Sequence, residues 1–200
     1  MPQTIDYYFA PQSPWAYLGH QRLRDVAKAA GASLRVLPVD LGGKVFPISG
    51  GLPLGQRAPQ RQAYRLVELR RFSEHLNAPL NLHPRYFPVG GDDASRLIIA
   101  VDLLHGAEAA MDMAGAILAA VWAQERNIAD PAVLGQLLSE QGLSSQAQDK
   151  AQSQEVQERY EQYTLQAIDS GVFGAPSYVV EGEIFWGQDR LDFLQRRLHA

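Results

Sequence analysis

The sequence predicts an α/β fold with a β-α-β half near the N-terminus, a β-β-α half near the C-terminus and a large all-helical insertion between them. In each half, short runs rich in β-branched and aromatic residues alternate with stretches of helical periodicity. Between the halves, apolar residues recur at helical spacing almost throughout residues 57–170. A chain of 200 residues with 46% hydrophobic residues can form one good core. We therefore expect a single unit, built from about residues 1–45 and 171–200, that carries the insertion.

The first forty residues predict the β-α-β half. Residues 4–9 and 34–39 are strand-like runs of aromatic and β-branched residues. The helix between them begins at Ser13, a favoured N-cap, with Pro14 at the first helical position, where its missing N–H costs nothing. Gly31 provides the stop signal for this helix.

Within the insertion, apolar spacing and caps predict several helices. Residues 63–76 have the pattern of an amphipathic helix. The Ala- and Met-rich run 107–125 lacks a wide polar face, so we expect it to be buried. Ser145 with Gln148 fits a capping box and predicts one polar helix that runs to Gly171.

The C-terminal half is marked by a proline at the start of a strand. Pro176 directly precedes the strand-like residues 177–180, and a turn leads to a second short strand at residues 184–186. Residues 187–190 then open a final helix. A proline removes a hydrogen-bond donor of the sheet, and a cis peptide there leaves the preceding backbone groups available to a ligand. Proline, hairpin and helix in this order are typical of the end of a thioredoxin-like fold.

The start of the first helix is the place where thioredoxin-like oxidoreductases carry a Cys-x-x-Cys pair. Residues 13–16 are Ser-Pro-Trp-Ala, and the chain contains no cysteine, so it has no thiol of its own. A helix N-terminus carries about half a positive charge, and such surroundings lower the pKa of a thiol. The Ser13 hydroxyl can also donate a hydrogen bond to a thiolate. The sequence therefore predicts a scaffold that binds and activates a thiol cofactor.

Four segments of the chain, residues 7–9, 13–18, 173–176 and 185–190, carry a resemblance to a known family. Together they resemble the 2-hydroxychromene-2-carboxylate isomerases, which are relatives of kappa-class glutathione transferases and of DsbA-type thioredoxin-like proteins. The resemblance covers both ends of the chain. It implies a DsbA/kappa-class architecture, glutathione as the cofactor and assembly as a homodimer.

The resemblance also implies roles for five residues. Ser13, as the catalytic residue, contacts the glutathione sulfur. The backbone of Ala175, next to Pro176, pairs with the peptide backbone of glutathione, and Gln188 and Asp189 hold its glutamyl end. The implied reaction is reversible addition of the thiolate to a conjugated, ring-opened aromatic carboxylate, rotation about the bond thereby made single, and elimination of the thiolate. This chemistry needs no metal and no redox change.

The middle of the chain departs from the family pattern. Residues 49–51 are Ser-Gly-Gly where the family usually has Thr-Gly-Asn, and Ala10 replaces a common aspartate. Arg61 takes the place of a lysine that usually follows a proline by two positions. Because arginine holds a carboxylate bidentately, we expect Arg61, together with Trp15, to contact the substrate.

Each site residue also has a purely structural interpretation. Ser13 and Asp189 are good helix caps, Arg61 lies on a charge-rich helix, and Trp15 can pack in the core. For the whole chain, a kappa-like glutathione transferase or peroxidase is the close alternative to an isomerase. A redox-dead thioredoxin-like protein that binds a peptide through the backbone before Pro176 is the alternative outside the enzymes.

Composition limits the partners. A net charge of −4 without a basic tract argues against nucleic acid. The longest apolar run, residues 107–125, contains Glu108 and Asp112, so no membrane span is expected. The five histidines lack ligand spacing, so we expect no metal site. Because the chain has no cysteine and no secretory signal-like run at its N-terminus, we expect a cytoplasmic protein.

Overall fold

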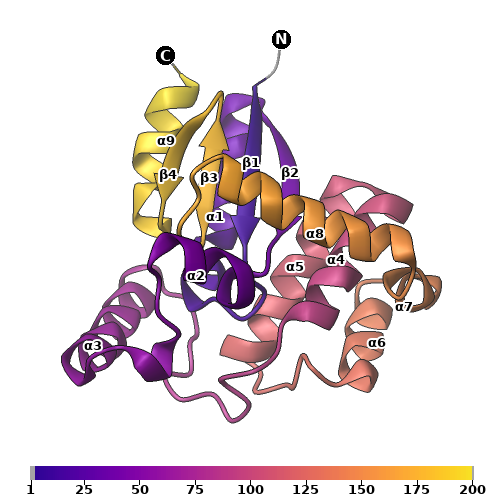
Figure 1. Cartoon of the computed structure of the whole chain (residues 1–200), viewed down its shortest axis with the longest axis horizontal. Coiled ribbons are helices and arrows are strands. Elements are labelled where there is room, and N and C mark those ends of the chain that lie inside the picture. Colours follow the sequence, from indigo (N-terminus) through magenta and orange to yellow (C-terminus); the bar gives the residue numbers. More distant parts are fainter. Residues whose placement is uncertain (1–2, 200) are drawn as a thin grey trace.

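The structure, a computed structural model, describes residues 3–199 and is built on one four-stranded sheet (Figure 1). Strands β1 (Thr4–Phe9), β2 (Ser33–Pro38), β3 (Ser177–Val180) and β4 (Glu183–Trp186) lie in the order β2-β1-β3-β4. β1 is parallel to β2, whereas β3 is antiparallel to both β1 and β4. The predicted α/β class, with its β-α-β and β-β-α halves, is confirmed.

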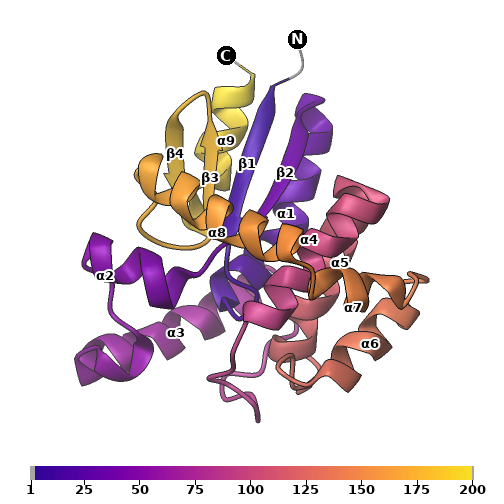
Figure 2. The same ribbon diagram turned by 45° about the vertical axis from the view of Figure 1, so that its right-hand side comes forward.

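Helices cover both faces of this sheet. α1 (Pro14–Ala30) and α9 (Leu191–Leu198) pack together on one face, and α8 (Gln154–Asp169) crosses the other (Figures 1 and 2). On β1, the ring of Tyr7 faces α1, where it lies 6.0 Å from the ring of His20. Side chains of a strand alternate between faces, so β1, which is central and largely buried, contributes to the core on both sides.

The insertion adds a helical layer beside the β2 edge of the sheet (Figure 2). It contains α4 (Asp92–His105), α5 (Ala107–Trp122), α6 (Pro131–Glu140) and α7 (Gln146–Ala151). Most residues of α5, the Ala- and Met-rich helix, are buried, and they belong to the same core cluster as the strands. Among the described residues, no helix is both long and apolar enough to cross a membrane.

A second part of the chain lies at the end of the sheet where β1 and β2 finish (Figure 1). It consists of the π-helical turn η1 (Leu41–Val45), α2 (Phe46–Ser49), the 3-10 turn η2 (Leu54–Gln56) and α3 (Pro59–His75). Within α3 only Leu69 is fully buried; of the other residues of the predicted apolar face, Leu66, Phe72 and Leu76 are half-buried and Ala63 is exposed. The long, largely exposed α3 lies near the carboxyl ends of β1 and β2 (Figure 1).

The prediction of one polar helix from Ser145 to Gly171 is wrong. The chain forms two helices, α7 and α8, and Ser153 is the N-cap of the second. Ser145 has helical backbone angles, φ −59° and ψ −17°, and its side chain makes no capping hydrogen bond. Ser153 has the extended angles that an N-cap needs, φ −72° and ψ 152°, and its Oγ accepts from the N–H of Val156 at 3.4 Å.

Candidate active site

The register of the sheet brings three separate segments of the chain to one end. Tyr8 of β1 pairs with Ser177 of β3, and Ser177 pairs with Trp186 of β4. Beyond this row, the N–H of Gly187 donates to the carbonyl of Pro176 at 2.9 Å. The loop after β1, the residues before β3 and the residues after β4 therefore meet there. All five residues that the family resemblance assigns to glutathione lie on these three segments.

Ser13 is both the cap of α1 and a polar group at the site. Its backbone is extended, and its Oγ accepts from the N–H of Ala16 at 3.2 Å. Its own N–H donates to the carbonyl of Ala10 at 2.9 Å, which fixes the loop after β1. The residue is 8% exposed. Because the cap uses only a lone pair of Oγ, the hydroxyl hydrogen stays available to a ligand.

The peptide bond between Ala175 and Pro176 is cis, as the sequence pattern indicated. Ala175 is half-buried, and its N–H and C=O form no hydrogen bond with another described residue. Trp186 supports this segment, because a side chain at Gly174 would meet its indole nitrogen at 2.4 Å. The ring of Phe173 also packs edge-on against Trp186, with centroids 4.8 Å apart. The backbone at Ala175 is thus held in place with its polar groups open.

Gln188 lies inside the protein and contacts another protein residue. It is 2% exposed, and Arg22 of α1 donates to both its carbonyl oxygen, at 3.0 Å, and its Oε1, at 2.8 Å. Gly19 permits this close approach, since a Cβ there would lie 2.8 Å from the Cβ of Gln188. These contacts of Gln188 hold the 3-10 turn η3 (Gln188–Arg190) against α1.

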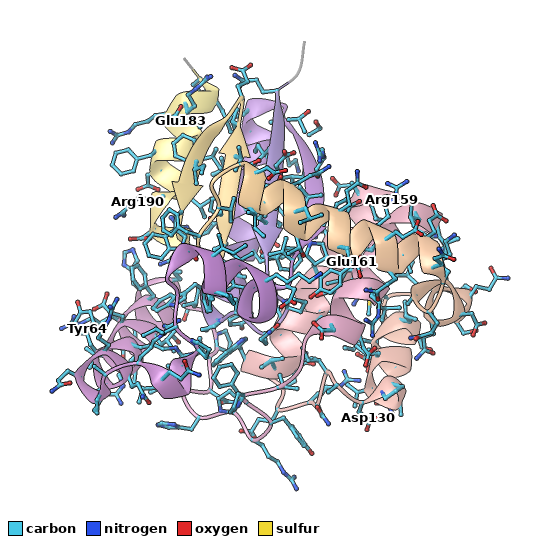
Figure 3. All side chains as sticks on the ribbon, in the orientation of Figure 1. Tyr64, Asp130, Arg159, Glu161, Glu183 and Arg190 are labelled. Carbon is cyan, nitrogen blue, oxygen red and sulfur yellow. The ribbon has the colours of Figure 1, made fainter. Side chains whose placement is uncertain are left out.

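Asp189, the next residue of η3, is exposed to solvent at the site. Its carboxylate pairs with Arg190 at 2.7 Å, and Arg190 projects from the outer side of the molecule in Figure 3. The Asp189 side chain is 44% exposed, so this exposed ion pair contributes little to stability. Of the two η3 residues assigned to glutathione, Asp189 therefore has the accessible carboxylate.

Trp15 and Arg61 differ in how they face the site. Trp15, in the first turn of α1, is half-buried and packs edge-on against Phe72 of α3, with ring centroids 6.0 Å apart. It forms a wall between α1 and α3 next to Ser13. Arg61 is exposed near the start of α3 and has no ion pair with a described residue.

Sequence reasoning did not assign a site role to two further arginines: Arg65, one helical turn after Arg61 on α3, and Arg57, in the extended segment before the helix. Both are half-buried. Burial and the neighbouring Arg57 lower the pKa of Arg65 to about 10. Burial and Arg61 lower the pKa of Arg57. The spacing of the three arginines was visible in the sequence, but nothing in it distinguished the half-buried pair from the exposed residue between them.

The structure explains why position 51, where the family usually has asparagine, is a glycine in this chain. A Cβ at Gly51 would lie 2.2 Å from the ring of Phe46, so the aromatic ring takes the space of a side chain. The neighbouring Ser49 hydroxyl donates to the carbonyl of Phe173 at 3.3 Å. This contact ties the segment after β2 to the segment before β3, on which Ala175 lies.

Known proteins resemble the chain over nearly its whole length. Residues 4–199 match the family model described as a DSBA-like thioredoxin domain. A curated 2-hydroxychromene-2-carboxylate isomerase from Pseudomonas putida is 31% identical over 194 residues, which are 96% of this chain and 92% of the relative. A solved structure of a 2-hydroxychromene-2-carboxylate isomerase has a TM-score of 0.79 at 26% identity, covering 98% of this chain and 94% of that chain.

A more distant neighbour shows the fold alone. The cytosolic disulfide reductase DsbM from Pseudomonas aeruginosa, solved with GSH, has a TM-score of 0.70 at 18% identity, over 98% of this chain and 100% of that chain. With the family model and the curated relative, these likenesses confirm the resemblance that the sequence motifs suggested. The chain belongs to the DsbA-like thioredoxin family and, within it, to the 2-hydroxychromene-2-carboxylate isomerases.

Proposed function

We propose that this enzyme is a glutathione-dependent isomerase that acts on a conjugated aromatic carboxylate. The observation that carries the proposal is the pairing of Ser13, whose hydroxyl hydrogen is available at the start of α1, with the open backbone of Ala175. In a chain without cysteine, this arrangement fits a peptide thiol brought from outside. The neighbour DsbM was solved with GSH, which supports glutathione as that thiol.

The residues of the site divide the binding of glutathione among them. In the proposal, Ser13 donates its hydroxyl hydrogen to the sulfur, and the positive end of α1 stabilises the charged form. Ala175, placed by Pro176, pairs with the peptide backbone. Asp189 accepts from the ammonium of the glutamyl end, and Gln188 holds the turn in position. Backbone hydrogen bonds orient the ligand, while the hydroxyl and the helix end act on its sulfur.

When bound, glutathione supplies the thiolate that adds reversibly to the conjugated substrate and leaves after rotation about the bond made single. Ser13 keeps the sulfur charged before addition and after elimination. Arg61 attracts the substrate carboxylate, and Trp15 provides an apolar wall for its ring. Together these contacts orient the substrate beside the sulfur. The proposal also includes a homodimer in the cytoplasm, for which the family resemblance is the support.

Titration of glutathione tests the role of Ser13. For the wild type we expect saturable binding and a bound thiol with a pKa below its ordinary value of about 8.5. Ser13→Ala removes the hydrogen bond to the thiolate, so the pKa of the bound thiol should rise by about one unit. The absorbance of the thiolate, recorded against pH, measures both values.

Ser153→Ala is the matched control, because it removes the N-cap serine of a different helix, α8. It should leave the pKa of the bound thiol unchanged. Absence of binding by the wild type at millimolar glutathione would refute the proposal.

A second assay distinguishes the isomerase from its alternatives. The absorbance change on conversion of a hydroxychromene carboxylate, in the presence of glutathione, should reveal turnover. No turnover, with conjugation of a chloro-nitroarene instead, would show a kappa-like transferase. Peptide binding without either reaction would show a redox-dead binding protein.

A further inference from the structure

Three arginines around the start of α3 have no carboxylate partner among the described residues. Arg61 and Arg65 lie one helical turn apart on α3, and Arg57 lies in the extended segment just before the helix. The charge of Arg57 acts on Arg65 and that of Arg61 on Arg57, so the three guanidiniums lie near one another. Arginines elsewhere, such as Arg24 and Arg96, pair with carboxylates. The positive charge of this arginine row is therefore not balanced within the described chain.

Two arginines of the row, Arg57 and Arg65, are half-buried against aromatic rings. The guanidinium of Arg65 lies over two aromatic rings, 5.3 Å from the centroid of Phe87 and 5.6 Å from that of Trp122, and Trp122 is fully buried. Arg57 lies 6.0 Å from the ring of Phe46, and its Nε donates to the carbonyl of Leu52 at 2.8 Å. Aromatic faces attract a cation but leave its charge uncompensated.

Burial makes this uncompensated charge unfavourable. It lowers the pKa of Arg65 to about 10, and the charge of Arg57 acts in the same direction. A partly buried cation gains most from an anion that also accepts its N–H groups. Each guanidinium is thus suited to a carboxylate that accepts from its N–H groups.

The position of the row connects the two sides of the site. On the Arg65 side, Phe72 lies seven residues further along α3 and so on the same face of the helix, and it packs against Trp15, two residues after Ser13. On the Arg57 side, the hydroxyl of Ser49 in the preceding segment donates to the carbonyl of Phe173, two residues before Ala175. The row therefore neighbours both segments of the proposed thiol site.

We propose that Arg57 and Arg65 together form the site for the substrate carboxylate, with Phe87 beside it as an apolar contact for the aromatic ring. The proposal rests on the proposed function, because it assigns the carboxylate of that substrate. It extends the expected contact at the exposed Arg61 to the two half-buried arginines on either side. These residues determine specificity for a charged substrate, whereas Ser13 acts on the thiol.

Calorimetric titration with two aromatic probes tests this assignment. Coumarin-3-carboxylate carries the charge, and coumarin-3-carboxamide has nearly the same shape without it. The wild type should bind the carboxylate at least about tenfold more tightly, which corresponds to about 1.4 kcal/mol. Arg65→Gln and, independently, Arg57→Gln should each reduce this preference several-fold.

Arg70→Gln removes the same charge from the exposed side of α3 and should leave the preference unchanged. Equal affinity of the wild type for both probes, or an unchanged preference in both glutamine variants, would overturn the assignment. If Arg65→Gln fails to fold, Arg57→Gln, which lies before α3, decides. Glutathione binding is measured separately, so its loss would count against the proposed function and not against the arginine site.

Discussion

At the scale of single residues, Arg22 joins α1 to the turn that carries Asp189. Its Nη1 donates to two oxygens of Gln188, and its Nη2 lies 3.4 Å from the carboxylate of Asp192. Gln188 is buried, so these hydrogen bonds fix the backbone of η3 directly. Arg22 therefore acts on Asp189 indirectly, as a positioning residue.

We predict that Arg22→Ala raises the KM for glutathione several-fold and leaves the pKa of the bound thiol unchanged. The turn loses two hydrogen bonds from a charged donor, each of which contributes about 1.5–3 kcal/mol when its partner is buried. Ser13 and the start of α1 remain intact. Steady-state kinetics and thiolate absorbance measure the two quantities.

Arg24→Ala is the matched control on the same helix, because Arg24 pairs with Asp112 and Glu108 of α5. Its KM for glutathione should equal that of the wild type. A higher pKa of the bound thiol in Arg22→Ala would contradict the positioning role.

The sequence predicted individual site residues where a local pattern carries the signal. Ser13 precedes a proline at a helix start, and Pro176 precedes a strand, so each is visible within a few residues. Arg57 and Arg65 have no such local pattern. Arg65 lies over the rings of Phe87 and Trp122 and Arg57 lies against the ring of Phe46, and only the folded chain brings these rings beside them.

At the scale of elements, the caps decide where helices begin. Ser153 and Ser145 both fit a simple N-cap pattern, but only the side chain of Ser153 accepts a hydrogen bond from the helix that follows. The choice depends on the backbone angles of the serine, which the packing of α7 and α8 sets. For this reason helical structure was predicted for this stretch, whereas the break that divides it into α7 and α8 was not.

We expect Ser153→Ala to lower the free energy of unfolding by about 1 kcal/mol, because it removes the cap of α8. Ser145→Ala should change it by less than about 0.5 kcal/mol, since that side chain caps nothing. Urea unfolding of the two variants gives the comparison. Equal losses would mean that the cap of α8 is not where the structure has it.

At the scale of the whole molecule, His20 joins the sheet half to the insertion. It lies on α1, is 6% exposed, and its Nε2 is 3.0 Å from the carbonyl of Met111 on α5. A carbonyl only accepts, so Nε2 carries the hydrogen and Nδ1 is unprotonated. Nδ1 is buried without a partner among the described residues. Burial lowers the pKa of His20 to about 4, to which the charge of Arg24 contributes, while Asp112 opposes it.

This low pKa predicts a loss of stability in acid. At pH values between the folded pKa of about 4 and the unfolded pKa of about 6.5, the unfolded chain binds a proton at His20 that the folded chain does not bind. Stability is therefore complete above the unfolded pKa and falls as the pH decreases toward about 4. Through His20, the free energy of unfolding at about pH 4.5 is lower by about 2–3 kcal/mol than at about pH 7.5.

His20→Gln isolates this effect, because other groups titrate similarly in both proteins. The wild type should lose about 2–3 kcal/mol more than the variant between these two pH values in urea unfolding. The same pH dependence in both proteins would show that His20 is not the group responsible.

The sequence by itself determined the order of the four strands along the chain, the absence of a resident thiol, and the residues whose motifs lie at the two ends of the chain. These properties depend on short-range patterns, such as side-chain alternation, caps and prolines, which act within one element. Only the tertiary structure decided how Gln188 is held by Arg22 and how Arg65 is half-buried against the rings of Phe87 and Trp122. Burial and close approach between distant segments determine those properties, because charge is costly only where packing removes water.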